Sequence, residues 1–278
     1  MPIKYADHIR RIEISSLWSG RKHIRWTLNP DVNILSGRNG EGKSTILNRL
    51  IKHLRTQPTT GELPPKSRHG VTMDFDPEDA ESIRYDIVRS FDRQLVQADG
   101  LKGIPGNSIL TELDWQLYLM QRRYLDYQVN VANRMVQLLT SGAPDAHEQA
   151  VAASALKTRF QDIVDELFSE TGKRLDRGSN ELRFHQYDEI IPPYLLSSGE
   201  KQMLLILLTA LTEAGQHYVF FLDEPEASLH MEWQEPLVGL IREHNPNAQL
   251  VLSTHSPGVI MNGWLDHVTE VRDITLDK

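Results

Sequence analysis

The chain has 278 residues, of which 40% are hydrophobic, so it can bury the core of one large domain or of a domain with an inserted lobe. It contains no cysteine, which excludes disulfides, thiolate metal sites and a cysteine nucleophile. The 30 basic and 38 acidic residues give a net charge of −8, so the surface as a whole does not attract nucleic acid. The longest apolar run, 203–208, is far shorter than the about 20 residues of a membrane span, and the opening residues lack a signal-peptide pattern. We therefore expect a cytoplasmic protein.

The first part of the chain predicts strands that lead to a glycine-rich loop. Residues 9–16 alternate apolar and polar side chains and, with 23–28, predict a hairpin around Trp18. Residues 32–35 predict a buried strand, and the helix after the loop is expected to end near Arg55. Two further strands are predicted at 70–75 and 82–90.

The glycine-rich loop fits the phosphate-binding pattern G-x-x-x-x-G-K-[ST] between a strand and a helix. Its glycines allow consecutive backbone N–H groups to point into one concavity at a positive helix end. Lys43 would reach the β- and γ-phosphates of a nucleotide, and the Ser44 hydroxyl would bind Mg²⁺. The alternative is a plain turn that starts a helix. The candidate nucleotide-binding residues are Gly37, Arg38, Asn39, Gly40, Glu41, Gly42, Lys43, Ser44 and Thr45.

A helical pattern occupies the middle of the chain. Apolar residues from Leu110 to Leu138 follow an alternating 3/4 spacing, 141–145 breaks the pattern, and Ala153 to Leu167 resume it. This predicts two antiparallel helices, each about 40 Å long, the second capped by Asp145. We interpret them as an arm for interaction, although ordinary helical core gives the same pattern.

The last third alternates strands and helices, which predicts a doubly wound sheet. A short strand is predicted at 181–186 and a buried helix at 203–211. A buried strand at 217–230 ends in carboxylates and precedes a helix near 231–243. A strand at 249–256, a short helix and a last strand at 267–274 follow.

Three groups in this third carry candidate chemistry. Asp223 would hold Mg²⁺ and Glu224 would polarise the attacking water, although two structural strand-end acids are the alternative. His255 follows the next strand and could bond the γ-phosphate, whereas a lone histidine is usually surface or core. Ser197, Ser198, Gly199 and Glu200 open a helix and form a second anion site. Because one chain needs a single γ-phosphate site, the second site suggests a nucleotide bound on another subunit.

Together these motifs resemble the ATP-binding cassette (ABC) ATPases. Gly37–Ser44 is similar to Walker A, Leu196–Glu200 to the signature motif, Val219–Glu224 to Walker B with its catalytic glutamate, and His255 to the switch histidine. The D-E-P-E text at 223–226 and the S-S-G-E signature resemble the SMC/RecF branch and OLD-family ATPases. Transporter cassettes usually carry S-A-L-D after the Walker B glutamate, where this chain has Ser228-Leu229-His230.

The resemblance implies an α/β fold: a P-loop NTPase head with a mixed central sheet, an N-terminal antiparallel β-subdomain and an inserted helical arm. The expected parts are an N-terminal ATPase lobe at 1–106, the arm at 107–172 and a C-terminal lobe at 173–278. It also implies a homodimer in which two chains sandwich two ATP–Mg²⁺ head to tail, each signature motif closing on the other chain's γ-phosphate.

Two further residues are assigned through the resemblance. Gln94 is the candidate Q-loop glutamine and a further Mg²⁺ ligand, with Gln97 as the alternative. Trp18 is the candidate for stacking on adenine, a contact worth about 1 kcal/mol. Trp26 or plain core packing would explain the same pattern.

The function implied is an ATP hydrolase whose dimer closes and opens, coupled to DNA or to a partner protein in DNA repair or antiphage defence. The arm is much shorter than a cohesin-type coil, and the chain ends soon after its last strand. We therefore expect any nuclease or other effector to be a separate protein, with DNA as a further candidate partner and no membrane. The alternatives are the ATP-binding subunit of a membrane transporter and a non-enzymatic module stabilised by ATP.

Overall fold

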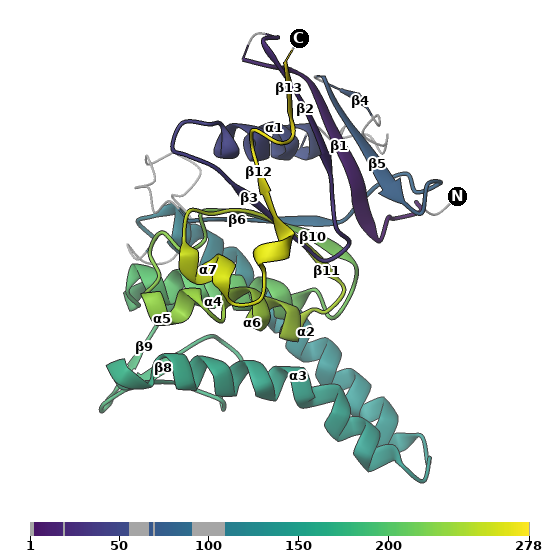
Figure 1. Ribbon diagram of the computed structural model, residues 1–278. Coiled ribbons are helices and arrows are strands. Elements are labelled where there is room, and N and C mark those ends of the chain that lie inside the picture. The colour runs from purple at the N-terminus through teal and green to yellow at the C-terminus, as the bar shows by residue number, and fades with distance from the viewer. Residues whose placement is uncertain (1–2, 19, 56–66, 69, 91–108, 278) are drawn as a thin grey trace. The chain divides into compact units, whose positions relative to one another are not determined.

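A computed structural model describes residues 3–18, 20–55, 67–68, 70–90 and 109–277 (Figure 1). Its contacts divide the chain into two compact units. Unit 1 comprises 1–90, 215–242 and 246–278, and unit 2 comprises 91–214 and 243–245. The helix that carries the predicted signature motif therefore belongs to the same unit as the two arm helices.

Unit 1 contains an antiparallel sheet, which confirms the predicted hairpin. Ile9, Ile12 and Ile14 are fully buried. Ile12 and Ile14 share a face because alternate side chains of a strand face the same side, and an irregularity in the register between Ile9 and Arg11 separates Ile9 from this alternation. Ile12 lies opposite the buried Trp26 in the register of the first two strands. The strand order is β13 (Thr275–Asp277), β2 (Lys22–Thr27), β1 (His8–Leu17), β5 (Val71–Asp76) and β4 (Ser67–Arg68).

The second sheet of unit 1 is parallel (Figure 1). It includes the strand before the glycine-rich loop and the strands that end at Asp223 and Ser253. Every pairing within its described strands is parallel, so their carboxyl ends meet at one edge. The strand that leads to the glycine-rich loop is separated by one strand from the strand that ends in Asp223. The order is β12 (Val268–Glu270), β3 (Val32–Ser36), β11 (Ala248–Ser253), β10 (Tyr218–Asp223) and β6 (Tyr85–Arg89).

Helix α1 (Lys43–Arg55) contacts strands of both sheets and ends where the sequence predicts. Its apolar face is buried through Ile46, Leu47 and Leu50 in the core of unit 1. The buried Gln249 of β11 also connects the sheets: its amide accepts from the Ile9 N–H at 2.8 Å and donates to the Ile9 carbonyl at 2.9 Å. These contacts join α1 and the two sheets in the core of unit 1.

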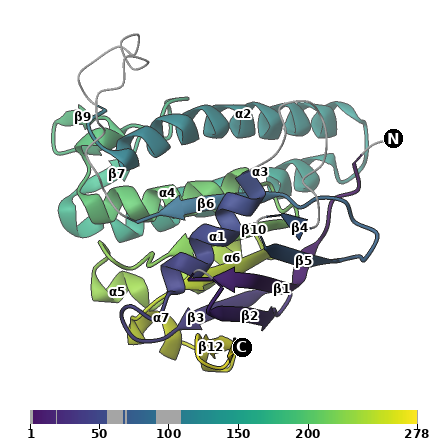
Figure 2. The ribbon, with the colours of Figure 1, turned by 90° about the horizontal axis from the view of Figure 1, so that it is seen from above.

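Unit 2 contains the two predicted arm helices, α2 (Glu112–Thr140) and α3 (Ala146–Leu167), which lie side by side (Figure 2). Leu117, Tyr124 and Phe160 of their seam are buried. Helix α4 (Ser198–Thr212) contacts both. A small antiparallel sheet completes the unit with β7 (Lys173–Leu175), β8 (Phe184–Gln186) and β9 (Glu189–Ile191).

Several expectations for individual elements are wrong. Leu110 is 63% exposed because α2 begins after its N-cap Thr111. Asp145 makes no side-chain cap bond and instead accepts from the Gln149 amide at 2.6 Å. The helix near 231–243 is divided into α5 (Met231–Gln234) and α6 (Leu237–His244), because Pro236 has no N–H to continue a helix.

The strand predicted at 267–274 is shorter than expected: only Val268–Glu270 of it forms a strand, and the next strand, Thr275–Asp277, begins after it. Strand β12 stays in the parallel sheet, while β13 crosses to the antiparallel sheet and pairs with β2. The remaining short helices are η2 (Ser169–Thr171), η3 (Pro193–Leu195), α7 (Pro257–Met261) and η4 (Leu265–His267). Among the described residues, every helix is too short or too polar to cross a bilayer.

Candidate active site

The glycine-rich loop turns back on itself between β3 and α1. Gly42 has φ +101°, a left-handed conformation that glycine adopts without strain. A Cβ atom at Gly42 would lie 2.3 Å from a ring carbon of Trp18. The indole of Trp18, which is 40% exposed, therefore covers the loop directly before Lys43.

Lys43 points its ammonium group into this loop and is 4% exposed. Its Nζ donates to the carbonyl oxygens of Gly37 at 2.9 Å and Arg38 at 3.3 Å. The carboxylate of Glu41 accepts from the Arg38 N–H at 2.8 Å. The loop thus holds a fixed cation beside its backbone N–H groups, an arrangement that suits an anionic phosphate chain.

Ser44, the next residue, meets the acid at the end of β10. Its hydroxyl donates to Asp223 Oδ1 at 3.0 Å, and the Ser253 hydroxyl donates to the same oxygen at 2.5 Å. One carboxylate and one hydroxyl fit Mg²⁺, which usually takes few protein ligands and completes its shell with water and phosphate oxygens. No cluster of three His, Cys, Asp or Glu side chains suited to a metal occurs in the described ranges.

Glu224 adopts φ +46°, uncommon for a residue with a side chain, and its N–H donates to the Ser253 carbonyl at 3.0 Å. Its Oε1 lies 3.1 Å from His255 Nε2. His255 Nδ1 lies 3.4 Å from Lys43 Nζ. Because an ammonium group can only donate, Nδ1 accepts and the ring proton of a neutral His255 sits on Nε2, facing Glu224. Glu224, His255 and Lys43 thus form one chain of contacts.

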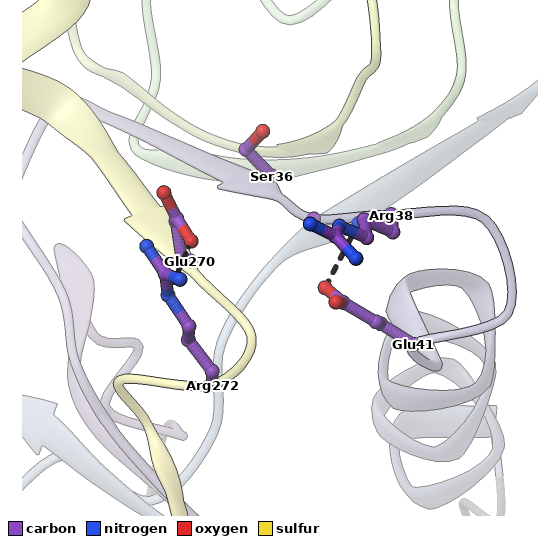
Figure 3. Close-up of a pocket in the computed structure, with 6 residues that line it drawn as sticks. Ser36, Arg38, Glu41, Glu270 and Arg272 are labelled. Atoms are coloured by element: carbon purple, nitrogen blue, oxygen red, sulfur yellow. Dashed lines mark hydrogen bonds and ion pairs between the residues drawn. The ribbon is translucent and has the colours of Figure 1, made fainter.

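A cavity of about 560 Å³ lies beside this loop (Figure 3). Arg38 and Glu41 from the loop face Glu270 and Arg272 across it, and Arg272 Nε lies 2.6 Å from Glu270 Oε2. Side chains of both charge signs line this cavity. Lys43 is not among the residues that line it, and phosphate binding by the loop N–H groups and Lys43 stays a prediction.

The predicted signature motif lies in unit 2, where Ser197 is the N-cap of α4. Ser197 and Ser198 are exposed, and Gly199 is buried. Glu200 is 2% exposed: its carboxylate accepts from Lys173 Nζ at 2.9 Å, from the Thr171 hydroxyl at 2.7 Å and from the Ser197 N–H at 2.8 Å. Burial alone raises the pKa of Glu200, but these hydrogen bonds outweigh it and lower that pKa below its usual value.

The start of α4 is also joined to the start of the arm. Lys201 Nζ lies 2.8 Å from Asp114 Oδ1, and both side chains are nearly buried. Asp114 closes the capping box of α2 with Thr111. Glu200, which closes the capping box of α4, thus binds Lys173 of β7, the strand that follows the arm. The next residue, Lys201, binds Asp114 of α2, the first helix of the arm.

Two assignments made through the family resemblance have different outcomes. Gln94 and its alternative Gln97 lie outside the described residues, so their roles stay predictions. Trp26 is 1% exposed and its Nε1 donates to the Thr269 hydroxyl at 3.3 Å, so it is a core residue. The alternative of adenine stacking on Trp26 is therefore wrong, and Trp18 remains the candidate.

The sequence did not single out Ser253 and Glu226 as site residues. Ser253 lies opposite Asp223 in the register of β10 and β11, and Glu226 accepts hydrogen bonds from the Thr254 hydroxyl and the His255 N–H. Both residues lie in the short sequence motifs around Asp223 and His255, and this position in the sequence was the signal that could have identified them.

A protein-family model described as "AAA domain, putative AbiEii toxin, Type IV TA system" matches residues 54–262, about three quarters of the chain. The chain belongs to this family. The matched range includes Ser197–Glu200, Asp223, Glu224 and His255, whereas the glycine-rich loop precedes it. The assignment of that loop therefore depends on its sequence pattern and geometry.

One curated relative, "Retron Vc95 probable ATPase" of Vibrio cholerae serotype O1 biovar El Tor, is 28% identical over 138 residues. The matched part is 46% of this chain and 26% of the relative, so the chain spans about a quarter of that protein.

Among solved structures, similar chains include an SmcHead bound to the C-winged helix domain of ScpA, with TM-score 0.48 and 13% identity, covering 92% of this chain and 91% of that one. The SMC head domain from Thermotoga maritima has TM-score 0.45 and 15% identity, covering 92% of each chain. Similarity of this degree does not establish a function.

Proposed function

We propose that the chain is an ATP hydrolase. Lys43 and the loop N–H groups would bind the phosphates, Ser44 and Asp223 would hold Mg²⁺, and Glu224 would polarise the attacking water. The observation that carries the proposal is the chain of contacts from Lys43 through His255 to Glu224, with distances of 3.4 Å and 3.1 Å. A hydrogen bond between a candidate base and an orienting group is one of the geometric criteria by which such a site is recognised.

The working form would be a homodimer that sandwiches two ATP–Mg²⁺. In it, Ser197, Ser198 and Gly199 of one chain would close on the γ-phosphate held by the other. Two features support this: both serines are exposed at the first turn of a 15-residue helix, whose positive end favours anions. Trp18 would stack on the adenine beside Gly42.

Dimer closure would change how the arm engages a partner. The support is local: Glu200 binds Lys173 at 2.9 Å and Lys201 binds Asp114 at 2.8 Å, so the first turn of α4 holds both ends of the arm. Truncating one member of a buried pair leaves a buried charge, so such contacts resist separation. The family description mentions a toxin and a Type IV TA system, and the relative is a retron ATPase. The partner we propose is a separate effector protein of a defence system, with DNA as a further candidate ligand.

The test is Glu224→Gln, which keeps the shape of the side chain and removes its basicity. ATP hydrolysis should fall by about 100-fold or more, and the variant should accumulate as an ATP-bound dimer in size-exclusion chromatography with light scattering. Glu232→Gln is the matched control, because Glu232 is an exposed glutamate nearby in the same stretch of chain. A Glu224→Gln protein that hydrolyses ATP at the wild-type rate and stays monomeric with Mg²⁺–ATP would refute the proposal.

A further inference from the structure

A second glutamate follows the proposed general base. Glu226 lies in the turn after β10, and its Oε1 accepts two hydrogen bonds from the segment after β11. One comes from the Thr254 hydroxyl and the other, at 3.1 Å, from the His255 backbone N–H. A carboxylate can only accept, so both donors are directed to one fixed oxygen.

Further hydrogen bonds fix the turn that follows β11, at Thr254 and Ser256. Thr254 is fully buried, and its hydroxyl oxygen accepts from the Ser256 N–H at 2.9 Å while its proton goes to Glu226. The Ser256 hydroxyl donates to Gln234 Oε1 at 2.5 Å and accepts from the Gly258 N–H at 3.1 Å. The turn between β11 and α7 is therefore fixed by residues that follow β10.

This arrangement sets the position of His255 relative to Glu224. The His255 backbone is held by Glu226, and its ring reaches Glu224 at 3.1 Å and Lys43 at 3.4 Å. Glu224 and Glu226 are two residues apart, so one short stretch of chain carries the proposed base and fixes the group that orients it. Neither Glu226 contact involves the atoms of Lys43, Ser44 or Asp223 that would bind the nucleotide.

We infer that Glu226 is a positioning residue for ATP hydrolysis, acting through His255 rather than on the nucleotide. The inference rests on the proposed function, because it assigns a role within the same site. A purely structural Glu226 would instead stabilise the fold and affect hydrolysis only as far as the protein unfolds. The two roles differ in whether the effect of Glu226 depends on the presence of the His255 ring.

The decisive experiment is a double-mutant cycle on kcat with Glu226→Ala, His255→Ala and the double variant. Glu226→Ala should lower kcat by up to about 100-fold, the cost of misplacing a catalytic group by about 1 Å, and should leave the affinity for a non-hydrolysable ATP analogue unchanged. In the His255→Ala background the same change should have little further effect. Glu232→Ala, an exposed carboxylate nearby, is the control.

A second pair of variants covers the case in which Glu226→Ala fails to fold. Thr254→Val keeps the shape of the side chain but removes the hydroxyl, and should reproduce the kcat defect. Thr254→Ser keeps the hydroxyl and should retain activity. Equal losses of kcat with and without the His255 ring, or no loss in Glu226→Ala and Thr254→Val, would overturn the inference.

A measurement without turnover separates this inference from the proposed function. The ¹⁵N signals of the His255 ring report which nitrogen carries the proton, and Glu226→Ala should shift them whereas Glu232→Ala should not. A wild-type protein that does not hydrolyse ATP would refute the proposed function, and the ring signals would still show whether Glu226 positions the His255 ring. Unchanged ring signals in Glu226→Ala would overturn it.

Discussion

The ring of His255 bridges Glu224 and Lys43: Nε2 lies 3.1 Å from Glu224 Oε1, and Nδ1 lies 3.4 Å from Lys43 Nζ. These three residues come from the ends of β10 and β11 and from the start of α1. A change at Lys43 can thus reach Glu224, the proposed base, through the side chain of His255.

The first prediction concerns this ring. His255→Ala should lower kcat by about 10- to 100-fold while Lys43, Ser44 and Asp223 keep the affinity for Mg²⁺–ATP. Steady-state kinetics measures kcat, and calorimetry with a non-hydrolysable ATP analogue measures the affinity. The informative result is a lower kcat with an unchanged affinity. His217→Ala is the control, because His217 directly precedes β10, at the end of that strand opposite Asp223, and its Nε2 lies 3.8 Å from Asp7 Oδ1. A parallel loss of affinity in His255→Ala would contradict the prediction.

Three candidate site residues, Asp223, Glu224 and His255, could be predicted from the sequence because each one lies at or just after the end of an apolar run that forms a parallel strand. Asp223, Glu224 and His255 could be placed together from the rule that parallel strands end at the same edge. Ser253 could not, since its bond to Asp223 depends on the register in which β10 pairs with β11. Partners set by register or by a turn are not visible in a pattern of spacing.

The second prediction concerns the glycine covered by Trp18. Gly42→Ala places a methyl group 2.3 Å from the Trp18 ring. It also forces an alanine into the left-handed backbone conformation of Gly42, which has φ +101°. The left-handed backbone costs about 1–2 kcal/mol, and displacement of the ring adds to it, so both stability and ATP affinity should fall. Urea unfolding and analogue binding measure these two losses.

A matched control isolates the contribution of the ring. Gly215 has φ +71° with open space around its Cβ position, so Gly215→Ala meets the backbone cost alone and lies outside the loop. Adding Trp18→Ala to Gly42→Ala should recover part of the lost stability. Equal stability of the Gly42→Ala and Gly215→Ala proteins would show that the indole does not restrict the loop.

The third prediction follows from the lowered pKa of Glu200. A carboxylate whose pKa is lower in the folded state stabilises the fold above its unfolded pKa, and this contribution is lost as the pH falls through the folded value. The usual pKa of glutamate is about 4.5. The free energy of unfolding of the wild-type protein should therefore decrease at pH values below this, partly because of Glu200.

Glu200→Gln should remove this part of the pH dependence, so the difference between wild type and variant should shrink as the pH falls. Urea unfolding from about pH 7 to about pH 3 measures it. Glu170→Gln serves as the control, because Glu170 is an exposed carboxylate next to Thr171. A difference between wild type and Glu200→Gln that stays constant across this range would contradict the assigned pKa direction.

The arm shows where spacing is a good predictor and where it fails. The 3/4 pattern predicted the buried Leu117, Tyr124 and Phe160, because one helix stripe faces the partner helix. It also included Leu110, which is 63% exposed because a capping residue starts the helix after it. The ion pair between Lys201 and Asp114 had no sequence signal, since its members are far apart in the chain and meet only after α4 packs against α2.

The fourth prediction compares two adjacent residues of α3. Phe160 is fully buried, with its ring centroid 5.9 Å from that of Tyr124 and 6.1 Å from that of His244. Phe160→Ala should lower the free energy of unfolding by about 3–5 kcal/mol, because it leaves a cavity in the core of unit 2. Arg159 pairs with Glu243 at 2.6 Å, but these side chains are 48% and 40% exposed, so Arg159→Ala should cost about 0.2–1 kcal/mol. Chemical denaturation monitored by circular dichroism measures both, and comparable losses would mean that the packing around Phe160 is not the dominant contribution at this position of the arm.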